Sequence, residues 1–423
     1  MNVVLSLMQL GLLRQFDPIQ KREFHTPVYN RRRFTHTWVL GKSGVGKSTA
    51  LVNWALQDII KGDGIAFFDP HGESADNILL HIPPSRRNDV ILYDPSDKNY
   101  PISFNILNNV LPDRRPFVAS SVVDAFKSIW GYSWGPQLEQ FLYNGVAALL
   151  DTPDGTLMGL KFLITSPTYR ARVIGHVKDP IIKDFWKTDF EELMPEREQR
   201  ERTLSTLNKI GALISDPAIR NSIGQSRTAL DLKDIIDNRK ILIVRLPQGQ
   251  LGIEKASLIG ALLMSNIHLT ALQRRAPNAF HIYADECHNF GNQTLIEMLS
   301  GIRKFGVSLI LAHQYLAQLT PEFRAALLGI VGTIVSFRLG AADAKLLAPE
   351  FQLSEQDDDP LHAVPPYHAY ARVNGRAPLL KMIPTDAREY PSSPKKIQNR
   401  CRSEYATPRL QVENRIERFI KNT

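Results

Sequence analysis

Residues 41–49 read Gly41-Lys42-Ser43-Gly44-Val45-Gly46-Lys47-Ser48-Thr49. The preceding residues 37–40 form an apolar run of strand length, and residues 50–56 continue in a pattern suited to a helix. Glycines let the chain turn sharply between the two elements and aim its N–H groups inward. Because such a concave turn at the start of a helix favours an anion, the stretch predicts a phosphate-binding loop.

Individual side chains of this loop have expected roles. Lys47 would reach the β- and γ-phosphates of a nucleoside triphosphate as a point charge, and Ser48 would give its hydroxyl to Mg²⁺. The backbone and side chains of the whole loop are candidate nucleotide contacts, namely Gly41, Lys42, Ser43, Gly44, Val45, Gly46, Lys47, Ser48 and Thr49.

The rest of the chain alternates short apolar runs with helical patterns. Strands followed by helices imply parallel strands with right-handed crossovers. We therefore predict an α/β fold, with a mostly parallel sheet between two layers of helices. The expected strands are residues 37–40, 65–68, 89–94, 102–107, 240–246, 280–286, 307–314 and 332–338, with a last strand pair within 367–382 around Asn374-Gly375.

One long segment interrupts this alternation. Residues 113–235 carry an amphipathic helical pattern, and the charge run at residues 196–202 suits an exposed helix face because its signs alternate. This pattern predicts an all-α domain inserted into the sheet domain. The expected organisation is an N-terminal segment 1–35, core segments 36–112 and 236–388 around the insertion 113–235, and a linker with a basic C-terminal helix in 389–423.

Composition narrows the class of protein. The chain has 423 residues, of which 43% are hydrophobic, enough for a large core in more than one domain. The formal charge of +8 suits a polyanionic partner but is also common in proteins that bind none. Cys287 and Cys401 lie far apart, so neither a disulfide framework nor a zinc site is expected. Residues 3–13 are too short to span a bilayer, and we expect a cytoplasmic protein.

The cluster Arg31-Arg32-Arg33 directly precedes the first strand of the core. A short run of like charge in this place is typical of a solvated linker.

Acidic residues follow two of the expected strands. Asp285 and Glu286 close one of them, where Asp285 would hold Mg²⁺ and Glu286 would orient and deprotonate the attacking water. Asp69 closes another, and either a place beside the nucleotide or a role as a helix cap or turn residue is open to it.

Gln314 ends a third strand, which would put its amide beside the γ-phosphate. His288 is expected to be an ordinary helix-start residue.

A second basic group is needed to stabilise charge during phosphoryl transfer. Arg338, at the end of a strand, is a candidate arginine finger that would reach the site of a neighbouring subunit, and Arg303 is its rival. Spacing within one chain does not choose between them, and each also fits a surface or packing role.

Together these motifs resemble the HerA/FtsK superfamily of DNA-pumping ATPases, in particular the type IV secretion coupling proteins of the TraD/TraG kind. The resemblance extends over nearly the whole chain. Its motifs are residues 31–33 leading into 41–49, Phe68 to Glu73, Trp134-Gly135-Pro136, residues 208–211 and 219–221, Tyr283 to Phe290, Arg303 to Gly306, Ala312 to Tyr315, Phe337 to Gly340, and Asp343-Ala344.

The resemblance implies a RecA-like P-loop NTPase core with an inserted all-α domain, working as a homo-oligomeric ring, usually a hexamer, around DNA. It implies ATP and Mg²⁺ as cofactors, Lys47 and Ser48 on the nucleotide and metal, and Asp285 and Glu286 as the second motif. It also implies Gln314 as sensor and Arg338, rather than Arg303, as the finger in trans. We expect a soluble form, since the membrane-spanning segments typical of coupling proteins are absent from the sequence. A relaxosome, a secretion channel at the inner membrane or a nuclease is the expected partner.

Two functions fit these motifs. The first is an ATP-driven DNA translocase that contacts DNA phosphates without sequence preference. The alternative is an assembly or recruitment ATPase of a secretion or defence system, whose nucleotide state controls binding to protein rather than DNA.

Overall fold

The computed structural model describes residues 7–17, 22–275, 277–353, 361–373, 377–382 and 393–423. The chain divides into two compact units, each built from three segments. The first unit combines Met1–Leu92, Lys233–Arg245 and Thr270–Gln398. The second combines Tyr93–Leu232, Leu246–Leu269 and Asn399–Thr423.

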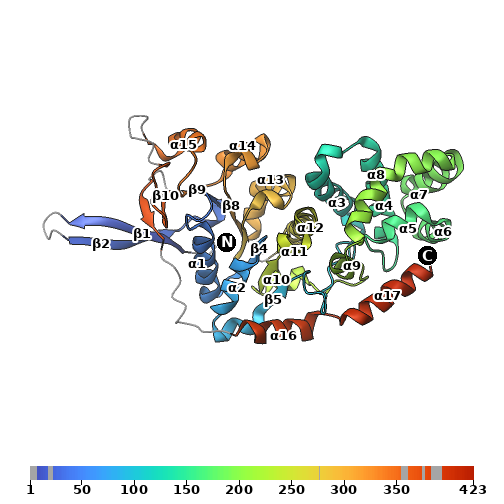
Figure 1. The fold of residues 1–423 in the computed structure, drawn as a ribbon, viewed down its shortest axis with the longest axis horizontal. Helices are drawn as coiled ribbons and strands as arrows, with labels where there is room; N and C mark the ends of the chain where they lie inside the picture. Colours follow the sequence, from blue (N-terminus) through green and yellow to red (C-terminus); the bar gives the residue numbers. More distant parts are fainter. Residues whose placement is uncertain (1–6, 18–21, 276, 354–360, 374–376, 383–392) are drawn as a thin grey trace. The chain divides into compact units, whose positions relative to one another are not determined.

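One sheet of 11 strands organises the first unit (Figure 1). Its strands are β1 (Met8–Asp17), β2 (Arg22–Asn30), β3 (Thr37–Leu40), β4 (Gly64–Asp69), β5 (Val90–Tyr93), β6 (Ile241–Arg245), β7 (Phe280–Ala284), β8 (Val307–His313), β9 (Thr333–Ser336), β10 (His368–Arg372) and β11 (Leu379–Lys381). Their order is β2-β1-β11-β10-β9-β3-β8-β7-β4-β6-β5. The neighbours from β9 to β6 pair in parallel, which confirms the predicted α/β fold with a mostly parallel sheet.

Helices cover both faces of this sheet, as the buried strands require. Every residue of β3, β4, β7 and β8 is buried. Helix α1 (Lys47–Lys61) packs on β4 and β7, and α2 (Glu73–Leu80) packs on β4 and β6. Figure 1 shows these two helices on one side of the strands and α13 (Asn292–Gly301) and α14 (Pro321–Ile330) on the other. The unit also contains α15 (Ala341–Leu347) and most of α10 (Leu232–Asp237).

A hairpin that the sequence did not predict extends the sheet. Strands β1 and β2 pair antiparallel, and β1 joins the sheet through β11, with Leu12 opposite Lys381. A Cβ at Gly11 would lie 2.8 Å from the Lys381 carbonyl oxygen, so this pairing needs glycine there. The predicted strand pair at the end of the core is present as β10 and β11, whereas its Asn374-Gly375 turn lies outside the described residues.

The prediction of a strand at residues 102–107 was wrong. Ile102 forms only an isolated bridge with Ala406. The backbone instead bonds to the helical unit, since Phe104 N–H donates to the Ser222 carbonyl at 3.2 Å and the Ser103 carbonyl accepts from Ala229 N–H at 3.1 Å. The side chain of Phe104 is nevertheless buried. The apolar residues of this segment therefore indicated burial correctly, although the segment does not form a strand.

The chain between β5 and β6 is mainly helical and contains no strand apart from the isolated bridge at Ile102. Aromatic side chains make the centre of this part, where Trp186 lies 5.2 Å from both Phe185 and Phe190 between ring centroids. Its elements are α3 (Arg115–Trp130), α4 (Pro136–Asp151), α5 (Gly159–Thr165), α6 (Pro167–His176), α7 (Pro180–Asp184), a π-helix (Phe185–Leu193), α8 (Glu196–Ile214) and α9 (Pro217–Ile223). The second unit also holds α11 (Gln248–Leu251) and most of α12 (Ile253–Ala271).

The charge run at residues 196–202 is an exposed helix face, as predicted. It begins α8, and Arg197 pairs with Glu201 at 3.0 Å, four residues on. Arg200 and Arg202 pair in the same way with Glu196 and Glu198. Such exposed ion pairs contribute little to the free energy of folding, so this run is a solvated helix face and is not part of the core.

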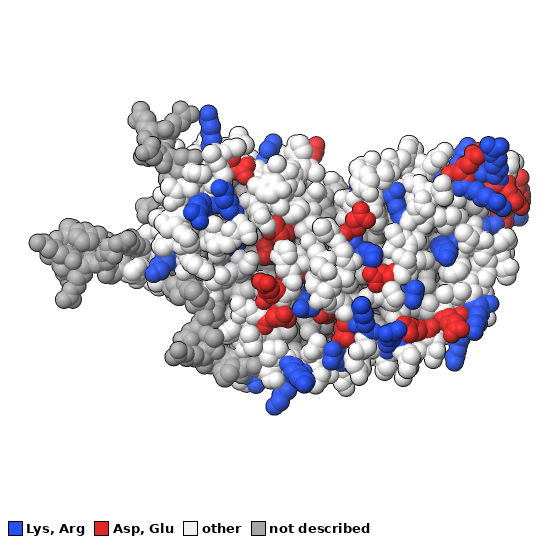
Figure 2. Space-filling view, viewed as in Figure 1, with Lys and Arg blue, Asp and Glu red and all other residues white. Residues whose placement is uncertain are grey.

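The C-terminal segment contains two helices where the sequence predicted a linker and one helix. They are α16 (Pro394–Tyr405) and α17 (Arg409–Lys421). Val412 and Ile416 of α17 pack with Met158, which anchors the second helix. Two of its basic residues form ion pairs within the helix, Arg409 with Glu413 at 2.8 Å and Lys421 with Glu417 at 2.7 Å. Figure 2 accordingly shows both signs of charge intermixed along this helix.

Arg33 is buried, although the sequence predicted a solvated linker for the whole run of arginines. Arg31 and Arg32 are exposed, whereas Arg33 is 1% exposed. The Arg33 guanidinium forms a bidentate ion pair with Asp58 of α1 and donates to the Tyr283 hydroxyl at 2.9 Å. The pair ties the segment before β3 to α1 and β7.

Arg33→Ala is expected to lower the free energy of unfolding by about 3–5 kcal/mol, because it leaves the Asp58 carboxylate buried without its cation. Urea unfolding of the protein without nucleotide measures the change. Arg32→Ala is the matched control, with an expected change within about 0.5 kcal/mol. Equal stabilities of the two variants would contradict the role of the buried pair.

Candidate active site

Five parallel strands bring the predicted site residues to one edge of the sheet. Strands β9, β3, β8, β7 and β4 are consecutive neighbours and run in the same direction. In such sheets ligands bind beyond the carboxyl ends of the strands. Those ends carry, from β9 to β4, Arg338, the loop 41–49, Gln314, Asp285 with Glu286, and Asp69.

The loop 41–49 turns through left-handed glycines into a helix whose start is open. Gly44 and Gly46 have φ of 75° and 107°. Helix α1 begins at Lys47 and has no side-chain cap at its N-terminus, so its first N–H groups are available to an anion. At the start of the loop, a Cβ added to Gly41 would lie 2.5 Å from the Cβ of Phe337 and would clash with it. The conformation therefore depends on glycine and fits the predicted phosphate cradle.

Lys47 is held inside this loop. Its side chain is 6% exposed, and its Nζ donates to the Lys42 carbonyl at 3.1 Å. Burial lowers the pKa of the amine, while the negative charges of Asp285 and Glu286 act in the opposite direction. A buried ammonium group costs free energy unless anions surround it. The triphosphate of a nucleotide would supply that negative charge.

Ser48 and Asp285 meet across the edge of the sheet, as the Mg²⁺ prediction requires. The Ser48 hydroxyl donates to Oδ2 of Asp285 at 3.0 Å. Asp285 is 3% exposed, and burial, followed by the charge of Glu286, raises the pKa of its carboxyl to about 6. Hydroxyl and carboxylate oxygens are the ligands that Mg²⁺ prefers, so the two side chains fit this ion.

Glu286 is fixed in an uncommon backbone conformation. Its φ is 48°, in the left-handed region, where residues other than glycine are rare and often functional. Its carboxylate accepts a hydrogen bond from Gln314 Nε2 at 2.8 Å, and Gln318 Nε2 lies 3.5 Å from its other oxygen. His288 lies in the short 3-10 helix Cys287–Asn289 that starts after Glu286, and its Nδ1 lies 3.7 Å from the same oxygen.

Gln318 is a site residue that the sequence did not reveal. Its Oε1 accepts from the N–H groups of Gln314 and Tyr315 at 2.8 and 3.1 Å. The same turn donates from Leu316 N–H to Asp343 at 3.1 Å. Gln318 therefore holds the turn that carries Gln314. Nothing in the order of residues marks it, because the contact depends on how the chain turns after β8.

Gln314→Ala is expected to lower kcat for ATP hydrolysis about 10–100-fold with nucleotide affinity unchanged, because Gln314 orients the Glu286 carboxylate and not the phosphates. Steady-state kinetics and equilibrium nucleotide binding measure the two quantities. Gln293→Ala, on the exposed side of α13, is the control. A variant that loses affinity and turnover equally would show that Gln314 contacts the nucleotide instead.

Asp69 adopts the cap and turn role that the sequence left open. Its Oδ1 accepts from His71 N–H at 2.9 Å, and its Oδ2 accepts from Ala75 N–H in the first turn of α2 at 2.8 Å. Both oxygens thus hold protein backbone. Asp69 still acts on the site through its charge, which contributes to the raised pKa of Asp285.

The two candidate arginine fingers lie at opposite ends of the parallel strands, Arg338 at the carboxyl ends and Arg303 at the amino ends. The Arg338 carbonyl accepts from Lys42 N–H at 2.9 Å, so Arg338 borders the phosphate loop of its own chain. Its side chain is half-buried and has no hydrogen bond or ion pair within the described residues. Arg303 is exposed, precedes β8, and its charge acts on His36, the residue before β3. Arg303 therefore lies at the amino ends of the strands.

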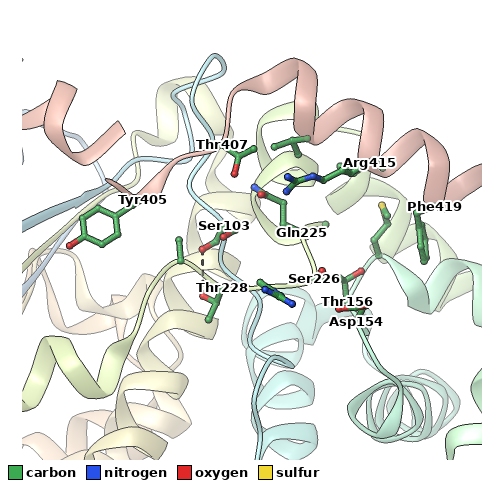
Figure 3. A pocket seen from close by; sticks show the side chains of 16 residues that line it. Ser103, Asp154, Thr156, Gln225, Ser226, Thr228, Tyr405, Thr407, Arg415 and Phe419 are labelled. Carbon is green, nitrogen blue, oxygen red and sulfur yellow. Dashed lines mark hydrogen bonds between the residues drawn. The ribbon is translucent and has the colours of Figure 1, made fainter. Parts of the chain in front are cut away.

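A separate cavity lies in the helical unit. It has a volume of about 640 Å³ and is lined by residues from α17 and from the segment after α9. Figure 3 shows Arg415 extending from α17 toward Gln225, with Ser226 and Thr228 nearby. None of the predicted site residues lines it.

Comparison with solved structures shows the same fold in a conjugative coupling protein and in VirB4. The bacterial conjugative coupling protein TrwB, in its TrwBdeltaN70 form, matches with a TM-score of 0.62 at 14% identity, over 85% of this chain and 87% of that one. The plasmid coupling protein TrwB in complex with ADP and Mg²⁺ matches at 0.60 and 16%, over 91% and 97%. VirB4 of Thermoanaerobacter pseudethanolicus matches at 0.60 and 15%, over 90% and 97%.

No protein-family model and no curated protein sequence matches the chain. In the parts that the structure describes, no helix has both the length and the apolar character to cross a membrane. The chain has the fold of TrwB and VirB4, which confirms the resemblance to type IV secretion coupling proteins at the level of fold.

Proposed function

We propose that this chain is a Mg²⁺-dependent ATPase that drives DNA through a ring of its own copies. The observation that carries the proposal is the cluster of Lys47, Ser48, Asp285, Glu286 and Gln314 at one sheet edge, linked by the hydrogen bonds from Ser48 to Asp285 and from Gln314 to Glu286. This cluster occurs in a chain with the fold of a plasmid coupling protein solved with ADP and Mg²⁺.

Each side chain has a task in phosphoryl transfer, which depends on positioning and on stabilising negative charge. Lys47 and the N–H groups of the loop bind the phosphates, and Ser48 and Asp285 hold Mg²⁺. When bound, Mg²⁺ neutralises charge on the phosphate oxygens. Glu286, held by Gln314, accepts a proton from the attacking water. Gln314 thus links the Glu286 carboxylate to the turn after β8, which is held by Gln318 and Asp343. A change in the position of Glu286 during hydrolysis would therefore be passed to this turn.

Arg338 is proposed to complete the site of a neighbouring subunit in a ring, with six copies as the expected number. We expect Arg338→Ala and Lys47→Ala each to be inactive, and a mixture of the two to regain part of the activity. The mixture creates interfaces in which one subunit supplies Lys47 and its neighbour supplies Arg338. ATPase rates over a range of mixing ratios measure the effect. A mixture that stays inactive would assign Arg338 to its own site.

DNA is the proposed cargo, in the manner implied by the likeness to conjugative coupling proteins. Contacts with DNA phosphates release counterions, so they weaken steeply with salt. The test is the ATPase rate with and without single- and double-stranded DNA across a salt series. Stimulation that fades with salt supports the proposal, and a rate indifferent to both DNAs contradicts it.

One observation favours the assembly or recruitment ATPase as the second candidate. Arg197 and Arg202 of α8 and Arg409 and Lys421 of α17 pair with acids four residues away, so these helices carry charges of both signs, which suits a protein partner as well as DNA. In that case ATP turnover would be slow and unaffected by DNA. We place the protein in the cytoplasm under either function, at the inner membrane only through partners such as a relaxosome, a secretion channel or a nuclease.

A further inference from the structure

Tyr367 lies against the phosphate loop, on the flank away from the acidic residues. Its N–H donates to the Val45 carbonyl at 2.9 Å, and its carbonyl accepts from Met382 N–H at 2.7 Å. A Cβ at Gly46 would lie 2.9 Å from Cδ1 of Tyr367. The ring is therefore in contact with the last glycine of the loop. The hydrogen bonds of its own N–H and carbonyl hold the backbone of Tyr367 beside the loop.

The conformation of Tyr367 is costly and its ring is open to solvent. Its φ is 60°, a left-handed value that bulky residues rarely adopt. The side chain is 47% exposed, and its hydroxyl forms no hydrogen bond within the described residues. Strain of this kind persists where the surrounding structure imposes it, and such positions cluster at ligand sites.

The direction of the bound nucleotide follows from the two flanks of the loop. The γ-phosphate end is marked by Asp285, Glu286 and Gln314, which follow β7 and β8 on one side of β3. Tyr367 directly precedes β10, and β9 and β10 lie on the other side of β3. Since the nucleoside is at the opposite end of the triphosphate from the γ-phosphate, it extends toward the flank of Tyr367.

We propose that the exposed face of Tyr367 is the stacking platform for the nucleobase of the bound nucleoside triphosphate. The inference rests on the proposed ATPase function and adds a subsite that the phosphate loop does not provide. Stacking on an aromatic face tolerates any base, because every base has a π-face. Tyr367 therefore contributes affinity for the nucleoside and leaves the phosphates to the loop.

The experiment measures binding of Mg-ATP and of Mg-tripolyphosphate by calorimetry to the full chain. Tyr367→Ala is expected to weaken ATP about tenfold, the scale of losing one base stack, and to leave tripolyphosphate unchanged. Tyr367→Phe retains the ring and is expected to bind both as the wild type does. Tyr29→Ala removes an equally exposed tyrosine, 47%, on β2 and is the matched control with no expected effect.

Two results would overturn the subsite. Unchanged ATP affinity in Tyr367→Ala would show that the ring does not contact the base. An equal loss for ATP and tripolyphosphate would show that Tyr367 only shapes the loop. A wild type that binds neither ligand would instead overturn the ATPase itself, and Lys47→Ala, expected to weaken both ligands together, separates that case from the others.

Discussion

Lys47→Ala is expected to lower ATP hydrolysis at least about 100-fold, because it removes the positive charge that faces the transferring phosphate in a water-poor site. Lys47 is 6% exposed, and its amino group stays within the loop at the Lys42 carbonyl. Water does not readily replace a charge in such a place. Nucleotide affinity should fall as well, since the ammonium contacts the phosphates in the ground state too.

Phosphate release and equilibrium ATP binding by purified Lys47→Ala measure the two effects. Lys61→Ala removes a lysine from the other end of the same helix, where it pairs with Asp63 at 3.3 Å near the surface. This control should hydrolyse ATP at the wild-type rate. Normal turnover in Lys47→Ala would show that the phosphate loop takes no part in ATP hydrolysis.

Glu286→Gln is expected to lower kcat about 10³-fold and to retain ATP binding. The amide keeps the size of the side chain but cannot accept the proton of the attacking water. Because Asp285 and Ser48 are untouched, Mg²⁺ and nucleotide should bind as before. Single-turnover hydrolysis and calorimetry separate the two quantities. Glu297→Gln, on the exposed side of α13, is the control, and a Glu286→Gln variant with wild-type kcat would assign the proton to another group.

The core of the fold was readable from the sequence because its strands are short and entirely buried. Residues 65–68 and 309–312 are apolar runs within fully buried strands. Polar residues such as Asp285 and Gln314 directly follow strands of this kind. The parallel order of the strands then brings those residues together at one edge without further information. This is why Lys47, Asp285 and Gln314 could be predicted to lie at the same edge of the sheet.

Contacts between distant segments could not be predicted in the same way. The pairing of β1 with β11 joins Leu12 to Lys381, and no local pattern encodes such a register. Arg33 belongs to a run of like charges, and its burial depends on Asp58 and Tyr283 far along the chain. Gln318 and Tyr367 reach the site through turns whose geometry decides where they point.

Displacement of streptavidin from biotinylated DNA tests whether hydrolysis at this site moves the protein along DNA. We expect ATP-dependent displacement by the wild type on single- or double-stranded DNA, no displacement by Glu286→Gln, and loss of displacement at high salt. Rapid DNA-independent hydrolysis with no displacement on either DNA would show that the proposed ATPase does not move DNA.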